Sequence, residues 1–388
     1  MPDTDLLILG AGASGLLCAL TAARLGRRVV VVDHGREPGA KVKIAGGGRA
    51  NVTNTSVGPE NYLSENPRFC ASALARFGTA EAVDLVRSCG LALEEREAGR
   101  LFLREPGAEL VAALVRACTS LGVSFLLGRE VRSACREGAG FRVETSAGAA
   151  RAGRLAVALG GPAWAACGAT DAGYALAKDF GLTIVAPRPG LVPFSMPKGW
   201  EFAALTGISL PVRIGCGRAV FSDQLLFTHR GLSGPAALQI SSYWRPGQEI
   251  AVDLLPGQDL EAELAAVTRG GLKVKNLLAG LLPARLPALL LGPEACELPV
   301  AGLGAARRRE VAARIHAWRI VPAGTLGLAR AEVTLGGVDT RAVSSRTMEA
   351  SGVPGLFFCG EVLDVAGWLG GYNLHWAFAS GAAAGSAP

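Results

Sequence analysis

Residues 5–15 read Asp5-Leu-Leu-Ile-Leu-Gly10-Ala-Gly12-Ala-Ser-Gly15, and a further apolar run follows at 16–20. An apolar run that breaks into glycines at this spacing predicts a strand, a tight turn and a helix. Gly10 permits the turn, Gly12 lets a pyrophosphate approach the backbone, and Gly15 lets the helix pack on its strand. Free N–H groups and the helix dipole favour phosphate at such a helix N-terminus. The stretch therefore predicts a dinucleotide site.

A second apolar run, Val29-Val-Val-Val-Asp33, ends in an acidic residue. An acidic side chain at this place accepts hydrogen bonds from ribose hydroxyls. A glycine triplet by itself is also compatible with a bare turn, but strand, helix, second strand and Asp33 occur here in the required order. His34 is interpreted as an exposed loop residue or as a lid over the adenosine.

The composition indicates a folded protein with a large core. The chain has 388 residues, of which 50% are hydrophobic and 19% charged, enough for two or three domains. The longest apolar segment, at 277–291, is interrupted by Pro283, Arg285 and Pro287, so no membrane-spanning helix is expected. The N-terminus leads directly into the glycine-rich strand, so no signal peptide is expected.

Nine cysteines occur without a Cys-x-x-Cys pair, which argues against a disulfide framework, a zinc site and a dithiol reductase. We therefore expect a cytoplasmic protein without a metal. The net charge is +6, and its one compact cluster is Arg307-Arg308-Arg309. A solvated helix face explains this cluster better than nucleic-acid binding does. We expect a small-molecule substrate rather than a nucleic acid or a membrane, and the oligomeric state is left open.

A glycine-dense loop spans residues 41–54 and contains Gly46-Gly47-Gly48 next to Arg49, Asn51 and Asn54. Three consecutive glycines suit a backbone that lies flat against a large planar ligand, with polar side chains at its edges. The alternative is a flexible surface loop.

The segment 66–128 has a mainly helical pattern and ends in an apolar strand at 123–127. Alternating residues on both sides of a turn at 137–140 predict further strands. The strand at 155–159 runs directly into Gly160-Gly161, a second place where backbone can meet a cofactor.

Pro/Gly punctuation at 186–190 marks a crossing into another domain. We predict a first nucleotide-binding part at 1–188, an inserted β-rich domain at 189–257 and a helical insertion at 258–318. A return strand at 319–333 and a second nucleotide-binding part at 334–388 complete the chain.

The last part returns to glycine-rich sequence at 334–339, then at Gly360-Glu361 and at Gly370-Gly371-Tyr372-Asn373. We expect the first stretch to belong to the nucleotide site and Gly360-Glu361 to contact a ribityl–pyrophosphate region. A helix that begins near Asn373 would direct its N-terminus at negative charge on a flavin ring.

Together these motifs resemble the HI0933-like (BaiN/RdsA-type) bacterial flavoproteins. The resemblance implies an α/β protein with an FAD-binding Rossmann-like domain of glutathione-reductase type, an inserted β-rich domain and a helical sub-domain. It also implies an FAD-dependent oxidoreductase. The matching stretches cover nearly the whole chain: 10–15, 38–54, 158–190, 226–235, 334–349 and 355–385.

The resemblance also implies the residues that contact FAD. These are Gly10, Gly12, Ala13, Gly15, Asp33, Gly47, Gly48, Arg49, Asn51, Gly360, Glu361, Gly371, Tyr372, Asn373 and Leu374, with Val131 at the adenine. We add neighbours in the same motifs, namely Ser14, His34, Lys41, Ala158, Gly160, Gly161 and Asp364. The chain departs from the family at Ala45, Ala50 and Leu159, where Ser, Cys and Thr are usual, and so lacks a loop cysteine beside the flavin.

The catalytic candidates are Trp368, Tyr372 and His375, because the flavin ring is expected between the loop 46–54 and the segment 368–375. The dipole at a helix start lowers the pKa of an imidazole, so His375 is either a base or a donor behind the site. The polar stretch at 226–235 caps the substrate, contacts the flavin edge, or is a satisfied turn that packs the β-rich domain against the FAD-binding domain.

The expected function is hydride transfer between FAD and NAD(P)H or a small organic substrate. With no second complete Gly-x-Gly-x-x-Gly unit, NAD(P)H is expected only as a transient electron donor over the flavin. One alternative is an oxygen-dependent oxidase of small amines such as aminoacetone, which would form peroxide without nicotinamide. A second is an RNA-linked flavoprotein, which would bind RNA with a steep salt dependence. A third is a flavin-containing sensory or structural module without turnover.

Overall fold

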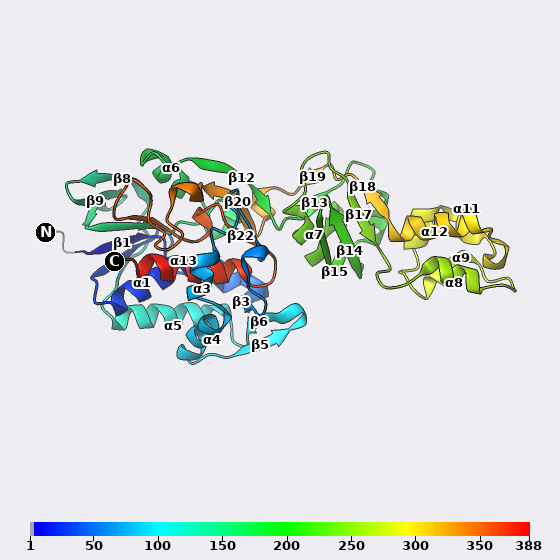
Figure 1. The fold of residues 1–388 in the computed structure, drawn as a ribbon, viewed down its shortest axis with the longest axis horizontal. Coiled ribbons are helices and arrows are strands. Elements are labelled where there is room, and N and C mark those ends of the chain that lie inside the picture. The colour runs from blue at the N-terminus through cyan, green and yellow to red at the C-terminus, as the bar shows by residue number, and fades with distance from the viewer. Residues whose placement is uncertain (1–3) are drawn as a thin grey trace. The chain divides into compact units, whose positions relative to one another are not determined.

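The computed structural model describes residues 4–388, which form two compact units (Figure 1). The first unit joins the described residues up to Pro189 to Glu332–Pro388, and the second is Gly190–Ala331. The second unit is thus an insertion in the sequence of the first.

A parallel five-stranded sheet forms the centre of the first unit, in the order β21-β11-β1-β2-β7. Strands β21, β11, β1 and β2 are largely buried and apolar, as parallel strands covered on both faces are, whereas the edge strand β7 is partly exposed. The strands predicted around the glycine turn, at 123–127 and at 155–159 are confirmed. The observed strands are β1 (Leu6–Leu9), β2 (Val29–Val32), β7 (Ser124–Leu126), β11 (Arg154–Val157) and β21 (Leu356–Phe358).

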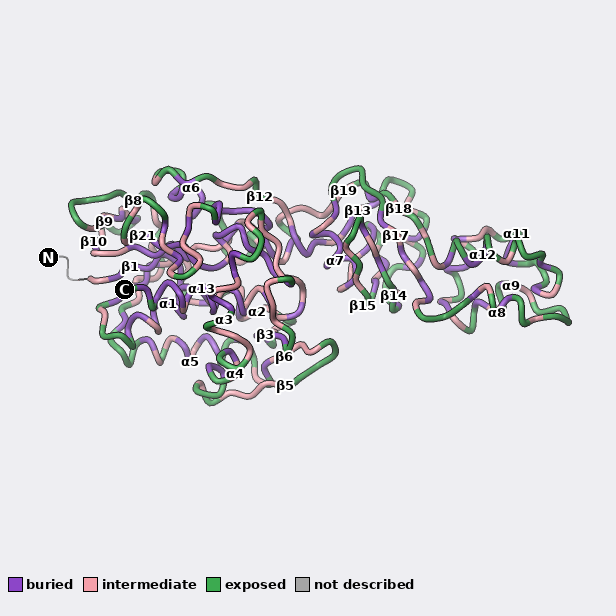
Figure 2. The backbone as a smooth tube through the Cα atoms, in the orientation of Figure 1, coloured by how far each residue is buried: buried purple, intermediate pink, exposed green. Residues whose placement is uncertain are grey.

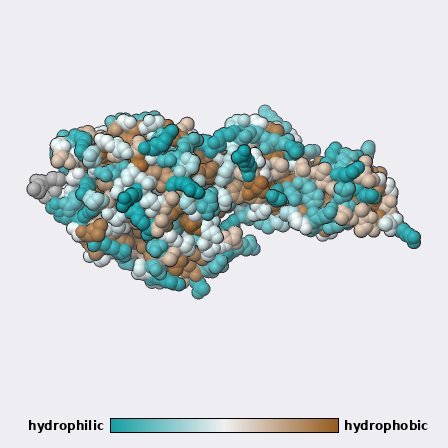
Figure 3. All heavy atoms as spheres, viewed as in Figure 1, coloured by the Kyte–Doolittle hydropathy of each residue, from teal (hydrophilic) through white to brown (hydrophobic). Residues whose placement is uncertain are grey.

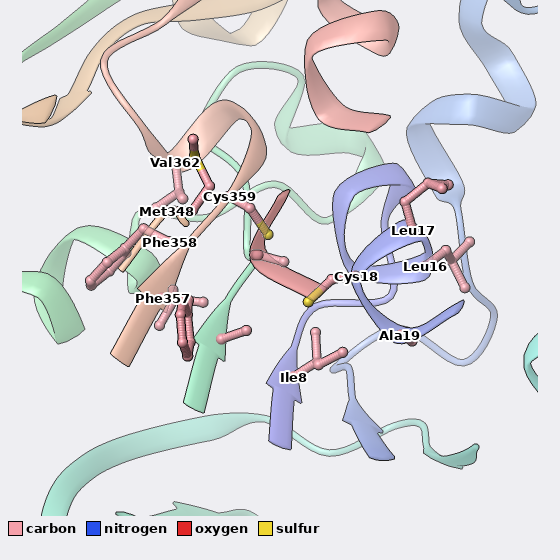
Figure 4. Packing of buried hydrophobic residues seen from close by; sticks show 14 of the residues in the cluster. Ile8, Leu16, Leu17, Cys18, Ala19, Met348, Phe357, Phe358, Cys359 and Val362 are labelled. Carbon is pink, nitrogen blue, oxygen red and sulfur yellow. The ribbon is translucent and has the colours of Figure 1, made fainter. Parts of the chain in front are cut away.

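Helix α1 (Ala13–Arg24) connects β1 to β2 and packs against the C-terminal helix α13 (Tyr372–Gly385). A Cβ atom at Gly381 or Gly385 would overlap a backbone carbonyl of α1, so small residues let these two helices approach closely. Helix α5 (Gly107–Ser120) packs on α1 as well. Figure 4 shows Ile8 of β1, Cys18 of α1 and Cys359, which follows β21, in this core.

Smaller elements surround the parallel sheet. The predicted strands on both sides of 137–140 form an antiparallel sheet of β8 (Val131–Glu137), β9 (Gly140–Thr145) and β10 (Gly148–Ala152). Two short pairs are β4 (Tyr62–Leu63) with β22 (Ala366–Gly367), and β12 (Ile184–Gly190) with β20 (Val333–Val338). The remaining α-helices in this unit are α2 (Ala40–Ile44), α3 (Ala71–Arg76), α4 (Thr79–Ser88) and α6 (Ala172–Asp179).

The mainly helical pattern predicted for 66–128 is wrong in its middle. There β5 (Leu93–Arg96) and β6 (Arg100–Leu103) pair with β3 (Asn51–Asn54) in an antiparallel sheet. The charged sequence of β5, Leu-Glu-Glu-Arg, has no apolar alternation, so only pairing with distant residues makes it a strand.

The expected cofactor role of the glycines at 334–339 is also corrected. They lie in the fully buried strand β20. A Cβ atom at Gly336 would lie 2.6 Å from the Ala186 oxygen, and one at Gly337 would lie 2.6 Å from the Val362 oxygen. These glycines therefore allow backbone segments to pack closely.

An antiparallel sheet in the order β16-β15-β14-β17-β18 dominates the second unit, and helix α7 packs on β14 and β15. Five α-helices lie in the sequence between β17 and β18, and buried residues of α8, α9, α10 and α12 belong to the same hydrophobic cluster as the buried sheet residues. Figure 2 marks the buried residues along the backbone in purple. The strands are β13 (Phe194–Ser195), β14 (Ser209–Cys216), β15 (Ala219–Thr228), β16 (Gly231–Ser233), β17 (Ile250–Asp253), β18 (Trp318–Ile320) and β19 (Gly324–Thr325). The helices are α7 (Gly234–Ser241), α8 (Leu260–Ala266), α9 (Val274–Ala279), α10 (Leu286–Leu291), α11 (Pro293–Glu297) and α12 (Ala305–His316).

No helix among residues 4–388 has the length and apolar character needed to cross a membrane. On the face drawn in Figure 3, hydrophilic and hydrophobic side chains are interspersed over both units.

Candidate functional site

The glycine turn after β1 leaves open space in front of a helix N-terminus. Gly10 has a φ of +108°, and a Cβ atom there would overlap the Ala158 carbonyl, as one at Gly15 would overlap the Gly10 carbonyl. No protein atom lies within 4 Å of a Cβ atom placed on Gly12. Gly12 is also the N-cap of α1 and supplies no side-chain cap. The first N–H groups of α1 therefore face a space that suits a phosphate.

Asp33 is held rigidly beside this turn. Its Oδ2 accepts a hydrogen bond from the Ala11 N–H at 2.6 Å, and its Oδ1 accepts one from the Gly35 N–H at 2.6 Å. A carboxylate has about four acceptor sites, so two bonds leave it able to accept ribose hydroxyls. The Arg129 N–H donates to the Asp33 carbonyl at 2.9 Å, which brings the start of β8, and with it Val131, toward Asp33.

His34 lies next to the loop that contains Gly168. A Cβ atom at Gly168 would lie 2.7 Å from the His34 Nε2 atom, and the His34 side chain is 41% exposed. Both earlier interpretations of His34, an exposed loop residue or a lid, fit this position.

The three-glycine loop presents bare backbone at two of its glycines. Gly46, Gly47 and Gly48 all have positive φ, at 57°, 70° and 93°. A Cβ atom at Gly46 would lie 2.9 Å from the Phe102 ring, whereas no atom lies within 4 Å of one at Gly47 or Gly48. Only glycine adopts such a run without strain, and the bare backbone at Gly47 and Gly48 leaves room for a ligand.

The Gly160-Gly161 pair divides in the same way. Gly160 has a φ of +74° and open space around its Cβ position. A Cβ atom at Gly161 would instead lie 2.7 Å from Thr334 Oγ1 and 2.8 Å from the Tyr174 hydroxyl. Of the two, Gly160 leaves room for a ligand, and Gly161 serves packing.

Glu361 is fixed by two contacts on different segments. Its Oε2 lies 2.9 Å from Lys41 Nζ, and its Oε1 accepts a hydrogen bond from the Thr334 N–H at 3.0 Å. A Cβ atom at Gly360 would overlap the Ser14 side chain, so this turn lies directly on the first turn of α1. The structure thus brings Ser14, Lys41, Gly360 and Glu361 together.

The Asp364 carboxylate is bonded to a segment that is distant in sequence. Its Oδ2 accepts a hydrogen bond from the Glu65 N–H at 2.7 Å and is 3.4 Å from Ser64 Oγ. Burial raises the pKa of the Asp364 carboxyl.

Two asparagines hold the segment that leads into α13. In the orientation that satisfies its partners, the Asn51 amide accepts from the Gly371 N–H at 3.1 Å and donates to the Thr53 carbonyl at 3.1 Å. Asn373 accepts from the Gly367 N–H at 2.8 Å and donates to the Gly367 carbonyl at 2.9 Å. Both asparagines therefore fix the loop that precedes α13, and Gly371, its N-cap, supplies no side-chain cap.

His375 is fully buried, and both of its ring nitrogens have partners. Nδ1 lies 2.7 Å from Thr53 Oγ1, and Nε2 lies 2.9 Å from the Phe77 carbonyl. A carbonyl only accepts, so we assign the proton to Nε2 and let Nδ1 accept from the Thr53 hydroxyl. Burial lowers the pKa of His375 to about 4. A neutral ring with two partners favours the interpretation of His375 as a donor behind the site.

Tyr372 and Trp368 form an aromatic cluster with Tyr62. The Tyr372 ring meets the Tyr62 ring edge-on, with centroids 6.2 Å apart, and the Trp368 ring at the same distance. The Tyr62 hydroxyl donates to the Tyr372 carbonyl at 3.0 Å. Tyr372 is 7% exposed and burial raises its pKa, whereas Trp368 is half-buried. Trp368 is therefore the more accessible of the two.

Three polar residues support the site although the sequence did not single them out. Thr53 bonds to His375, Thr334 bonds to Glu361, and the Ser380 hydroxyl accepts from the Gly360 N–H at 2.9 Å. Each acts through a contact with a residue distant in sequence, which local spacing does not reveal. Within the described part of the chain, no group of three or more His, Cys, Asp or Glu side chains could hold a metal ion.

The family model described as the HI0933-like protein Rossmann domain matches residues 4–387. The chain belongs to the HI0933-like family. A ribosomal RNA dihydrouridine synthase of Escherichia coli (strain K12) is 45% identical over 98% of this chain and 96% of its own length. The protein of that name from Haemophilus influenzae is 43% identical over 96% of both chains. A 3-dehydro-bile acid delta(4,6)-reductase of Clostridium scindens is 30% identical over 98% of both.

Members of this family are FAD-binding oxidoreductases, and this chain is a flavoprotein enzyme of that class. The residues present fit FAD. Gly12, Gly47, Gly48 and Gly160 have open space at their Cβ positions, and the N-terminus of α1 has no side-chain cap; we call these positions the cradle.

Proposed function

We propose that this chain reduces a uridine of ribosomal RNA to dihydrouridine with FAD as its cofactor. The proposal rests on the difference in sequence identity between two groups of relatives. The two relatives named as ribosomal RNA dihydrouridine synthases are 45% and 43% identical, whereas the bile acid reductase is 30% identical. All three comparisons span nearly the whole chain, so the difference reflects the complete protein.

This proposal takes the RNA-linked alternative in place of a small organic substrate, and it makes a nucleic acid the partner. The small-substrate interpretation is supported by the bile acid reductase, at lower identity. None of the three relatives supports an amine oxidase by its name.

FAD, when bound, supplies a hydride from its reduced ring. The conversion of uridine to dihydrouridine adds this hydride and one proton across the C5–C6 double bond. The protein binds the cofactor, orients the base and provides the proton.

We assign the cofactor contacts to the open glycines and to the two fixed carboxylates. The α1 N-terminus takes the pyrophosphate, Asp33 the adenosine ribose, and Glu361 the ribityl side. The N-terminus of α13 stabilises negative charge on the reduced ring through its dipole. NAD(P)H is the proposed transient source of electrons.

Near the reacting base we propose Trp368 and Tyr372 as the contacting side chains. The raised pKa of Tyr372 keeps its hydroxyl protonated and able to donate a hydrogen bond. His375 is proposed as a positioning residue, because its bonds to Thr53 and to the Phe77 carbonyl tie α13 to β3 and to the residue that follows α3.

The test uses ribosomal RNA from a strain that lacks the modification. The holoenzyme, NADH or NADPH, and this RNA are incubated, and the nucleosides are then analysed by mass spectrometry. The expected result is a dihydrouridine, heavier than uridine by two hydrogen atoms, at a defined position. Absence of dihydrouridine together with rapid reduction of a small conjugated ketone would replace the proposal with the small-substrate interpretation. Peroxide formation from an amine without nicotinamide would support the oxidase.

A further inference from the structure

The second unit carries most of the net charge of the chain. Gly190–Ala331 contains 15 Lys and Arg residues against 10 Asp and Glu residues, a net +5 out of the +6 of the whole chain. The remainder, which holds the glycine cradle, has a net charge of only +1. A polyanion is therefore attracted to the second unit more than to the first.

Several of the cations of the second unit lie beside an acid. Lys273 and Lys275 both pair with Glu297, and Arg307 and Arg314 both pair with Glu310. The Arg307-Arg308-Arg309 cluster on α12 is accordingly a solvated helix face with an acid beside it. An RNA phosphate gains less there, because it must compete with a carboxylate already in place.

The turn between β15 and β16 has the opposite character. Its residues are Thr228-His229-Arg230-Gly231, within the polar stretch that the sequence singled out. The His229 and Arg230 side chains are exposed, and neither forms an ion pair among residues 4–388.

The backbone of this turn is held on several sides. Thr228 Oγ1 accepts from the Arg230 N–H at 3.3 Å and the Gly231 N–H at 3.1 Å, and the hydroxyl donates to the Gly231 carbonyl at 2.9 Å. The Arg230 carbonyl accepts from the Met196 N–H at 2.9 Å. Gly231 has a φ of +151°, and a Cβ atom there would overlap the Phe194 carbonyl. The turn is therefore fixed before any partner arrives.

The bond to Met196 places a second exposed cation next to the turn. Lys198 lies two residues after Met196 in the same loop and, in the described chain, has no ion pair. Glu201, the nearest acid along the chain, is exposed but pairs with neither cation. We call Lys198, His229 and Arg230 the basic rim of the second unit.

We infer that this basic rim binds the sugar–phosphate backbone of the RNA substrate. The inference rests on the proposed function and names the surface that would hold its substrate. Arg230 suits bidentate contact with a phosphate, and Lys198 supplies a point charge beside it. Such contacts set the register and orientation of an RNA without reading its sequence. A fixed turn also loses little conformational entropy on binding.

The experiment compares the full-length holoenzyme with a double variant, Lys198→Ala with Arg230→Ala. Binding of protein-free ribosomal RNA from a strain lacking the modification is measured at several salt concentrations. Two lost phosphate contacts should weaken binding at least tenfold at low salt. They should also reduce the slope of log K against log salt by about 1.5, at roughly 0.7–0.9 per contact. Arg230→Lys keeps the charge and should retain most of the slope.

Arg218→Ala is the matched control, because it removes one exposed arginine at the other end of β15. It should leave the affinity nearly unchanged. Flavin absorption and thermal unfolding verify that each variant is folded and holds its cofactor. The single variant Arg230→Ala is measured beside this control, and an equal loss in Arg218→Ala and Arg230→Ala means that binding follows net charge alone, which overturns the inference.

Different results would contradict the basic rim and the proposed function. If the wild-type protein makes dihydrouridine but the double variant binds RNA with unchanged affinity and salt slope, only the basic rim is wrong. If the wild-type protein neither binds ribosomal RNA at low salt nor modifies it, the proposed function itself is wrong, and the inference with it.

Discussion

The first unit has glycines with open space at their Cβ positions, where we propose that FAD binds, whereas the second unit carries most of the net charge of the chain. The proposed cofactor binding in the first unit depends on the absence of side chains at a few backbone positions. The proposed RNA binding in the second unit depends on exposed cations that lack an acid neighbour. The glycine positions give a strict sequence pattern, whereas unpaired surface cations give almost none.

The largest expected effect comes from two neighbouring glycines of the α1 turn. Gly12→Ala meets no protein atom within 4 Å and has an ordinary φ of −78°, so the apoprotein should fold with unchanged stability but lose FAD. Gly15→Ala should lower the stability of the fold itself, by about 1–3 kcal/mol or more, because its Cβ atom overlaps the Gly10 carbonyl. Flavin absorption and thermal unfolding of both apoproteins separate the two outcomes. Full FAD occupancy in Gly12→Ala would contradict the cradle.

His375 should make the protein less stable in acid. Its pKa of about 4 in the folded state lies below the ordinary 6.5, so the unfolded chain takes up a proton that the folded chain refuses. The stabilisation is complete above pH 6.5 and is lost as the pH falls toward 4, by about 3 kcal/mol.

Urea unfolding of the wild type and of His375→Gln, at neutral pH and near pH 4, measures this loss of stability. The difference between the two proteins removes the contribution of all other titrating groups. An identical pH dependence in both would show that His375 is not buried in its neutral form. A kcat that falls at constant KM in His375→Gln, with Thr53→Val giving a similar result, supports positioning through Thr53.

The carboxylates of the cradle come next in size. Asp33→Ala and Glu361→Ala should each weaken FAD retention by about 1.5–3 kcal/mol, through the loss of charge-assisted hydrogen bonds. Ultrafiltration of the purified variants, followed by flavin quantification, measures the retained cofactor. Asp339→Ala is the control, because its carboxylate pairs with Arg341 instead of the cradle residues. Retention equal to the wild type in both cradle variants would refute the placement of the site.

The smallest effect is expected in the arginine cluster of α12. Arg307→Ala removes a cation that already pairs with Glu310, so RNA affinity should change by less than about twofold. The same binding assay as for the basic rim gives the measurement. A tenfold loss would move the RNA surface from the basic rim to α12.

The sequence predicts the first unit well where one local pattern suffices. The turn at Gly10, Gly12 and Gly15, the apolar strands and the small-residue C-terminal helix all follow from spacing. The resemblance to the HI0933-like family, which the family model confirms, rests on the same motifs.

Sequence alone fails where distant residues decide. Strand β5 has no apolar pattern, and Gly336 and Gly337 look like nucleotide glycines until Ala186 and Val362 are seen against them. His375 illustrates the same limit, because its position near a helix start is visible, but its bonds to Thr53 and Phe77 are not. The i,i+3 spacing of Arg307 and Glu310 already indicates an ion pair on a helix, whereas the lack of an acid partner for Arg230 among the described residues is seen only in the structure.

The most direct test of RNA reduction follows the flavin itself. The bound FAD is reduced under anaerobic conditions, and ribosomal RNA from a strain lacking the modification is added. We predict that the oxidised flavin absorption returns and that one dihydrouridine forms per flavin, whereas RNA that already carries the modification leaves the flavin reduced. A flavin that stays reduced with unmodified RNA, yet is oxidised at once by a small conjugated ketone, would contradict the account.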